Sequence, residues 1–253
     1  MPEGHLIHRH AREQHAALAG HVVRAAGPQG RFDARPYDGR ALAGVEAVGK
    51  HLLYHFEDGL PAIHVHLGMR GIFLRHDDPA AEPRRGTRLR LATGEVAYDL
   101  IAPSRCEPLG APGVGALFAS LGPDPLREDA SAPEAVRRLT AFRGPVGAGV
   151  LDQGVWAGLG NAWRAELLFL LGLHPGTRGL DAETALRLWE AAVTYLALGR
   201  DAGQVVSDPA APDERWVYKR ERCRRCGTPV ETWQLASRTA YACPLDQPAP
   251  YEV

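Results

Sequence analysis

The sequence predicts an α+β protein made of several domains, and three observations carry that prediction. Between residues 22 and 100, short apolar alternations are punctuated by Gly, Asp and Pro, a pattern typical of an antiparallel β-sandwich or barrel. After residue 131 the apolar spacing becomes helical. Three of the four cysteines lie after residue 222, in a compact basic unit. The predicted domains are 1–120 (sandwich), 131–213 (helical) and 214–253 (hairpin), with 121–130 as a linker.

In the N-terminal part, we expect a helix from Glu3 to Leu18, with Gly20 just beyond its end. Apolar residues then alternate in short segments, which favours strands over helices. The clearest predicted strands are 51–56, 62–67, 71–76 and 87–92.

In the second part, the two prolines of LGPDPL (121–126) mark the boundary. A capping box at 131–134 predicts a helix to about Phe142. A strongly apolar helix follows over 161–171, with Asn161 as its expected N-cap. Asp181 begins a third helix, which we expect to stop at Gly199 before a loop over 204–214.

Composition excludes several classes of protein. The net charge of −1 gives no global signature of nucleic-acid binding, so such a role requires a local basic patch. The longest apolar run, 167–173, is far shorter than the roughly 20 residues of a membrane span. The start of the chain lacks the features of a signal peptide, so we expect a cytoplasmic protein without a membrane role. In that reducing compartment, four cysteines favour a metal site or a lone thiol over disulfides.

The C-terminal cysteines have the spacing of a metal site. Cys223 and Cys226 are followed by Cys243 and, after two intervening residues, by Asp246. Each tight turn places two ligands on one edge of a tetrahedron, so we expect zinc bound by three thiolates plus Asp246 or water. The alternative is a hairpin that has lost its metal and is held by packing.

The same unit carries the local basic patch. Residues 214–243 contain seven basic and three acidic residues, with four aromatic residues among them. Basic and aromatic residues interleaved in this way are typical of a nucleic-acid-binding hairpin, and a solvated charged face is the alternative. The basic residues are Arg215, Lys219, Arg220, Arg222, Arg224, Arg225 and Arg238, and the aromatic residues are Trp216, Tyr218, Trp233 and Tyr241.

Two further segments could carry chemistry. Gly158 and Gly160 precede the helix that begins at Asn161, and such a turn lets a phosphate approach unpaired N–H groups, although a simple tight turn is the alternative. Removal of Met1 would leave Pro2 with a secondary α-amine next to the carboxylate of Glu3. An α-amine is deprotonated more readily than a lysine, and it can attack an aldehydic carbon to form an iminium. The alternative is an ordinary frayed terminus.

Lysine is rare in this chain, with 2 lysines among 29 basic residues. In such an arginine-rich sequence, a lysine is the residue that a role needing a deprotonatable amine would retain. Lys50 and Lys219 are therefore both candidates for a specific role, and for Lys50 the alternative is a surface lysine on a strand. We expect Lys219 to contact phosphate.

Several motifs together resemble the formamidopyrimidine-DNA glycosylase and endonuclease VIII family along nearly the whole chain. They are MPEG followed by His, GKHLLYHF (49–56), HLGMRG (66–71), LGPDPL (121–126), LLFLLGLHP after LDQGVWAGLGN, and the cysteine hairpin. The resemblance implies a β-sandwich, a helix-two-turn-helix domain and a zinc finger.

The resemblance also implies residue roles. Pro2 corresponds to the nucleophile, Glu3 to the acid/base, and Lys50 to the lysine of proton donation and phosphate contact. Asn161 and Arg238 match residues that grip phosphates, and Arg238 is also associated with δ-elimination. Met69 corresponds to a residue that fills the space left by the everted base, and Arg70 could share that role.

The chain departs from the family pattern at two positions. Asp246 stands where a fourth cysteine is usual, which puts the zinc in question, and Gly147 stands where many members have a lysine. Cys106 resembles a cysteine of some endonuclease VIII-like members, but we interpret it as a half-buried thiol.

The expected function is a bifunctional DNA glycosylase and AP lyase that acts as a monomer on damaged double-stranded DNA, without an organic cofactor. The opening MPEG-His favours the endonuclease VIII branch and oxidised pyrimidines, with 8-oxoguanine and formamidopyrimidines as the alternative. From other classes, we weigh a catalytically silent damaged-DNA-binding module and a metalloenzyme that uses histidines such as His64 and His66.

Overall fold

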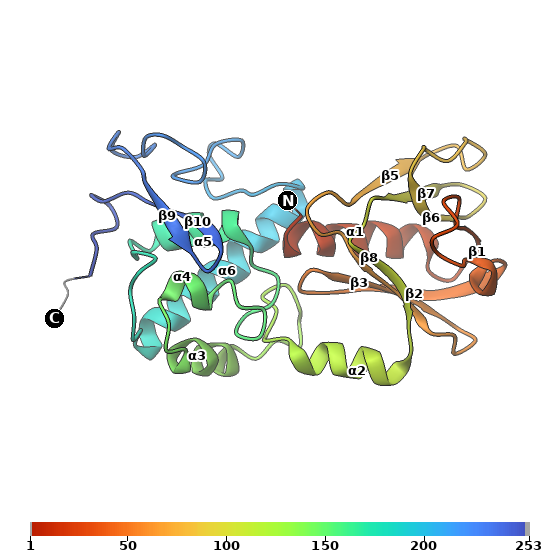
Figure 1. Ribbon diagram of the computed structural model, residues 1–253, viewed down its shortest axis with the longest axis horizontal. Coiled ribbons are helices and arrows are strands. Elements are labelled where there is room, and N and C mark those ends of the chain that lie inside the picture. The colour runs from red at the N-terminus through yellow and green to blue at the C-terminus, as the bar shows by residue number, and fades with distance from the viewer. Residues whose placement is uncertain (1, 251–253) are drawn as a thin grey trace. The chain divides into compact units, whose positions relative to one another are not determined.

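The computed structural model describes residues 2–250, and the chain divides after Ala119 into two compact units (Figure 1). The first unit contains one long helix, eight strands and a 3-10 helix, and α2 ends at its boundary. The elements are α1 (Gly4–Leu18), β1 (Val22–Ala26), η1 (Arg35–Tyr37), β2 (Arg40–Val48), β3 (His51–Phe56), β4 (Ala62–His66), β5 (Ile72–His76), β6 (Thr87–Ala92), β7 (Ala97–Ile101), β8 (Arg105–Leu109) and α2 (Ala111–Ser120).

All strand pairs of the first unit are antiparallel, in the order β5-β7-β6-β1-β2-β3-β4-β8. Strand β1 joins the two halves of this sheet, because Val22 and Val23 pair with β2 while Arg24 to Ala26 pair with β6. One hydrophobic core contains residues of both halves and of α1, such as Leu42, Leu89 and Ile7. The predicted antiparallel architecture is confirmed.

The four predicted strands correspond to β3, β4, β5 and β6, whereas β1, β2, β7, β8 and α2 were not assigned from the sequence. Strand β8 contains Pro108, which argues against a central strand, but β8 lies at the edge of the sheet, where proline is tolerated. Helix α2 includes Pro112 and two glycines, and none of its residues is buried. Its sequence therefore lacks the apolar stripe from which a helix is predicted.

The second unit consists of helices followed by a two-stranded hairpin. The caps predicted at its first and third helices are present, since Ser131 Oγ accepts from Glu134 N at 3.3 Å and Asp181 Oδ1 accepts from Thr184 N at 2.7 Å. The elements are α3 (Ala132–Ala141), α4 (Val146–Gly149), α5 (Asn161–Leu170), α6 (Ala182–Ala202), β9 (Glu231–Leu235) and β10 (Arg238–Ala242).

Two predicted helix ends are wrong. Gly160 is the N-cap of α5, so Asn161 is the first helical residue and its side chain makes no cap. Helix α6 continues through Gly199, which is buried, and ends at Gly203 with φ +73°. Gly203 N donates to the Gly199 carbonyl, so the left-handed glycine that terminates the helix lies one turn later than predicted.

Tryptophans form the centre of the core of this unit. Trp156 is buried, donates from Nε1 to the Ala135 carbonyl at 2.9 Å, and meets Trp189 edge to face with ring centroids 5.2 Å apart. The segment 121–126 packs onto the same unit, because Gly122 N donates to the Gln153 carbonyl at 2.8 Å and Ala157 N to the Pro123 carbonyl at 3.0 Å.

Within residues 2–250, no helix combines the length and the apolar character needed to cross a bilayer.

Candidate functional site

The candidate nucleophile and its neighbouring carboxylate lie at the start of α1. Pro2 is half-buried, and Glu3 is only 2% exposed although it is the N-cap residue. The Glu3 carbonyl accepts from Leu6 N at 3.0 Å and from Ile7 N at 3.3 Å, which fixes the backbone next to Pro2. The residue that follows Pro2 therefore carries a buried carboxylate. Met1 lies outside the described residues.

Helix α1 runs along β2 in a direction that can be followed from its contacts. Gly20 N donates to the Leu42 carbonyl at 2.8 Å, and Val45 N donates to His15 Nδ1 at 3.2 Å. Moving toward the start of α1 therefore means moving along β2 toward its end at Val48. The Gly49–Lys50 turn follows Val48, so the start of α1 is directed toward the turn that carries Lys50.

Three histidines from two strands cluster next to the half-buried Lys50, which directly precedes His51. His51 Nδ1 lies 2.9 Å from His64 Nε2, and the rings of His51 and His66 are 4.9 Å apart at their centroids. Burial, followed by the two neighbouring imidazoles, lowers the pKa of His51 to about 3, and Lys50 contributes in the same direction. Burial also lowers the pKa values of His64 and His66. All three shifts favour the neutral imidazole.

Met69 lies at the tip of a tight turn between β4 and β5. Its side chain is 68% exposed, whereas the turn beneath it is fixed. Gly71 N donates to the Leu67 carbonyl at 2.9 Å, and a Cβ on Gly71 would lie 2.4 Å from that same oxygen. Gly68 has φ +65°, and Ser104 would obstruct any side chain there. These two glycines hold Met69 and the exposed Arg70 at the surface on a rigid support.

Asn161 lies at the beginning of α5 and is 8% exposed. Its Nδ2 donates to the Thr239 carbonyl at 3.0 Å, while its Oδ1 is buried without a hydrogen-bond partner among the described residues. The preceding turn is braced by Gln153, whose Oε1 accepts from Gly158 N at 3.0 Å and whose Nε2 donates to the Leu159 carbonyl at 3.1 Å.

Arg238 is the first residue after a two-residue hairpin turn. Ala236 and Ser237 form that turn with φ values of +52° and +58°, the left-handed geometry that suits the twist of a hairpin. The Arg238 side chain is exposed and makes no hydrogen bond or ion pair with a residue that the structure describes. It is available for an external anion.

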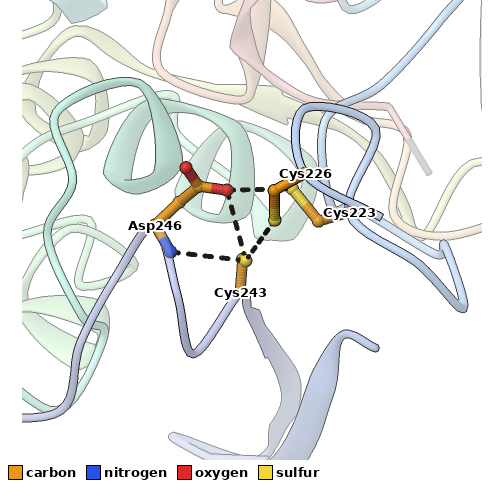
Figure 2. Close-up of side chains that lie close together, drawn as sticks. All are labelled: Cys223, Cys226, Cys243 and Asp246. Carbon is orange, nitrogen blue, oxygen red and sulfur yellow. Dashed lines mark hydrogen bonds between the residues drawn. The ribbon is translucent and has the colours of Figure 1, made fainter. Parts of the chain in front are cut away.

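The four predicted metal ligands come together, as Figure 2 shows. One ligand atom from each of Cys223, Cys226, Cys243 and Asp246 lies within 4.8 Å of the others. Asp246 Oδ2 is 3.2 Å from Cys223 Sγ and 3.3 Å from Cys243 Sγ, and Cys226 Sγ is 3.4 Å from Cys243 Sγ.

The donor set fits zinc. A tetrahedral ion with Zn–S bonds of about 2.3 Å places its sulfur ligands roughly 3.8 Å apart, close to the spacing observed here. Arg225 Nη1 lies 3.7 Å from Asp246 Oδ1, so the carboxylate has one oxygen toward the thiols and the other toward a cation. Among the described residues, this is the group of three or more His, Cys, Asp or Glu side chains that could hold a metal ion.

Three of the seven basic residues of the predicted patch form ion pairs with carboxylates of the protein. Arg220 pairs with Glu214 at 2.6 Å, Arg224 with Asp208 at 2.7 Å, and Arg225 with Asp246. The aromatic residues also pack within the unit: Trp216 stacks on Phe169 and Trp233 on His174. Lys219 is exposed with φ +57° and lies above the Tyr218 ring, with Nζ 5.6 Å from its centroid.

Two buried charged residues of α5 were not singled out from the sequence. Glu166 is fully buried and accepts from the backbone N–H groups of residues 216–218 at 2.8–3.0 Å, and also from Ser207 Oγ. Arg164 is 1% exposed and donates to three carbonyl oxygens. Their sequence signal was available, because NAWRAELLFL is a helix that is apolar on every side except for these charges.

Comparison with known proteins identifies the family of this chain. The Formamidopyrimidine-DNA glycosylase N-terminal domain matches residues 1–100, and the Formamidopyrimidine-DNA glycosylase H2TH domain matches residues 121–208. Endonuclease 8 1 of Mycobacterium tuberculosis is 37% identical over 98% of this chain and 100% of its own length. The chain belongs to the formamidopyrimidine-DNA glycosylase and endonuclease VIII family.

Other members of the family are similarly related. Probable endonuclease 8 2 of Streptomyces coelicolor is 33% identical over 99% of this chain and 95% of its own length. Formamidopyrimidine-DNA glycosylase of Gloeobacter violaceus is 34% identical over 81% and 79%, respectively. The Lactococcus lactis formamidopyrimidine-DNA glycosylase, solved with AP-site DNA, shares the fold with a TM-score of 0.80, 21% identity, and coverage of 98% of this chain and 100% of that one. The chain is thus a DNA glycosylase of the formamidopyrimidine-DNA glycosylase/endonuclease VIII family.

Proposed function

We propose that this family member is a bifunctional DNA glycosylase and AP lyase that excises oxidised bases, preferably pyrimidines, from double-stranded DNA. The observation that carries the proposal is the buried Glu3 carboxylate next to Pro2, at a helix start directed toward the turn of Lys50. The full-length similarity to endonuclease 8 proteins supports the pyrimidine preference.

The proposed chemistry begins once Met1 has been removed. The Pro2 nitrogen attacks the anomeric carbon of the damaged nucleotide, and a C–N bond forms while the glycosidic bond breaks. The base leaves with the bonding electrons and takes up a proton. Glu3 donates a proton to the opening sugar ring, and the resulting iminium acidifies the adjacent carbon, so that β-elimination and then δ-elimination break the strand. Lys50 assists proton transfer and contacts phosphate.

DNA binding is assigned to four residues that present different chemistry. Met69 supplies an exposed apolar side chain that fills the gap left by the everted nucleotide. Asn161 and Arg238 grip backbone phosphates, and Arg238 also assists δ-elimination. Lys219 is a further phosphate contact. We assign catalysis to the domain 1–120 and DNA binding to the domains 131–213 and 214–253, with 121–130 as the linker between them.

We also propose that zinc is held by the three thiolates and Asp246. The ion would be structural, since four protein ligands close its coordination sphere. Its role is to hold the turn after β10 against the 223–226 turn, which stabilises the hairpin that carries Arg238.

Borohydride trapping tests the proposal. The protein that begins at Pro2 is incubated with duplexes carrying an oxidised pyrimidine, 8-oxoguanine or an abasic site, and sodium borohydride reduces any iminium to a stable adduct. The matched control is the same chain with Met1 retained, which blocks the amine. We expect adducts only for the processed protein, formed faster with the oxidised pyrimidine than with 8-oxoguanine. DNA binding without any adduct would instead identify a silent damaged-DNA-binding module.

A further inference from the structure

The guanidinium of Arg164 lies beneath the hairpin turn that presents Arg238. Arg164 is 1% exposed and belongs to α5. Its Nη1 donates to the Leu235 carbonyl at 3.1 Å and to the Gly147 carbonyl at 3.3 Å, and its Nη2 donates to the Thr239 carbonyl at 2.8 Å. Burying a cation raises the free energy of the folded state unless the cation is hydrogen-bonded. The three carbonyl groups must therefore keep their positions around the guanidinium.

The two hairpin carbonyls flank Arg238 on both sides. Leu235 ends β9 and is the cross-strand partner of Arg238, and Thr239 follows Arg238 in β10. One planar group therefore spans the base of the Ala236–Ser237 turn. The fork of a guanidinium fixes two acceptors at a set separation, which the single ammonium of a lysine cannot do.

The same side of α5 also brings Asn161 to this point. Asn161 Nδ2 donates to the Thr239 carbonyl at 3.0 Å, so that one carbonyl receives a donor from each of two α5 residues one turn apart. The hairpin packs against Gly147, where there is no room for a side chain. A Cβ on Gly147 would lie 2.9 Å from Leu235 Cδ2. The absence of a lysine at 147 is thus part of how Leu235 packs here.

We infer that Arg164 is a positioning residue, which holds the hairpin turn so that Arg238 is presented at a fixed distance from Asn161. This inference rests on the proposed function, in which Asn161 and Arg238 grip neighbouring phosphates and Arg238 assists δ-elimination. Isolated two-stranded hairpins are only marginally stable, so the precision of Arg238 has to come from an anchor outside the hairpin. Misplacing a catalytic group by about 1 Å reduces rates on the order of 100-fold.

A double-mutant cycle tests the inference. Arg164→Lys keeps the charge and loses the fork, Arg238→Ala removes the presented group, and Arg187→Lys on the exposed face of α6 is the matched control. We expect Arg164→Lys to reduce δ-elimination between about 10- and 100-fold while borohydride adducts at Pro2 persist. The double variant should be no worse than Arg238→Ala alone, because both changes affect one group.

Two results would overturn the inference: δ-elimination unchanged in Arg164→Lys, or losses that multiply in the double variant, as a general structural defect would produce. A physical readout accompanies the cycle. Trp233 stacks on His174 with centroids 5.1 Å apart, so we expect acrylamide to quench the total tryptophan fluorescence more strongly in Arg164→Lys than in the control.

The wild-type protein supplies a measurement that does not depend on whether a variant folds. The amides of β9 and β10 that are hydrogen-bonded across the two strands should exchange as slowly as those of α5, and fast exchange throughout the hairpin would contradict the anchor. The two failures can be told apart. Wild-type protein that gives no borohydride adduct defeats the proposed function, whereas exchange and quenching report on the anchor in either case.

Discussion

Replacing Glu166 by Gln should destabilise the protein strongly, although the two side chains have nearly the same shape. Glu166 is fully buried, and its carboxylate accepts four hydrogen bonds. Oε1 receives Val217 N at 3.0 Å and Tyr218 N at 2.9 Å, and Oε2 receives Trp216 N at 2.8 Å and the hydroxyl of Ser207. A glutamine retains one acceptor oxygen and turns an NH₂ group toward the remaining donors.

The expected loss of unfolding free energy is estimated for the glutamine orientation that keeps the most hydrogen bonds. With the NH₂ group in the Oε2 position, the Ser207 hydroxyl can rotate to accept, but Trp216 N faces another donor. One buried unsatisfied N–H costs about 1–3 kcal/mol, and each surviving bond loses about 1 kcal/mol when its acceptor becomes neutral. Since the neutral amide is easier to desolvate, the net loss is about 3 kcal/mol, or roughly 6–12 °C in Tm for a chain of this size.

Urea unfolding followed by tryptophan fluorescence measures this loss. Glu190→Gln, on the exposed face of α6, is the matched control and should change the free energy of unfolding by less than about 0.5 kcal/mol. If Glu166→Gln changed it no more than the control does, the argument that this carboxylate holds the 216–218 segment onto α5 would be refuted.

Three further predictions concern the metal cluster, a buried thiol and the histidines. Asp246→Cys should raise Tm only when zinc is present, because a fourth thiolate strengthens the site; an equal rise in the presence of a chelator, measured by differential scanning fluorimetry, would rule this out. Burial raises the pKa of the Cys106 thiol to about 12, so iodoacetamide at pH 8 should leave Cys106 unmodified in the folded protein while zinc protects the exposed Cys226, as checked by peptide mass spectrometry. Burial lowers the pKa of His51 to about 3 and those of His64 and His66 below 6.5. The unfolded chain therefore binds protons that the folded chain does not as pH falls from about 6.5 toward 3, and the free energy of unfolding should decrease in that window; urea midpoints that do not change between pH 7 and 5, or a His51→Gln variant with the same pH profile, would contradict this.

Local signals predicted the parts of the fold that depend on local chemistry. The caps at Ser131 and Asp181 follow from side-chain oxygens that reach nearby N–H groups, and strands such as His51–Phe56 follow from their apolar residues. The ends that were wrong depend on tertiary contacts. Gly199 is a good helix terminator in isolation, but it lies against the core and α6 continues to a second glycine, Gly203.

The candidate site divides in the same way. The cysteine cluster was predicted because ligand spacing along the chain limits where the ligands can meet, and the structure brings all four together. For the basic patch, a count of charges could not show that Arg220, Arg224 and Arg225 form ion pairs with carboxylates of the protein. The anchoring roles of Arg164 and Glu166 depend on hairpin and loop backbone more than 35 residues away in sequence, so only their unusual place in an apolar helix could have indicated them.

The central claim is that the Pro2 nitrogen is the nucleophile, and locating the borohydride adduct by peptide mapping tests it most directly. The chain has only two lysines, so Lys50 and Lys219 are the competing amines. Trypsin should release the N-terminal peptide 2–9, and tandem mass spectrometry then identifies the modified nitrogen. The account predicts that the reduced sugar is on Pro2 of this peptide. An adduct on Lys50 or Lys219, with peptide 2–9 unmodified, would contradict it.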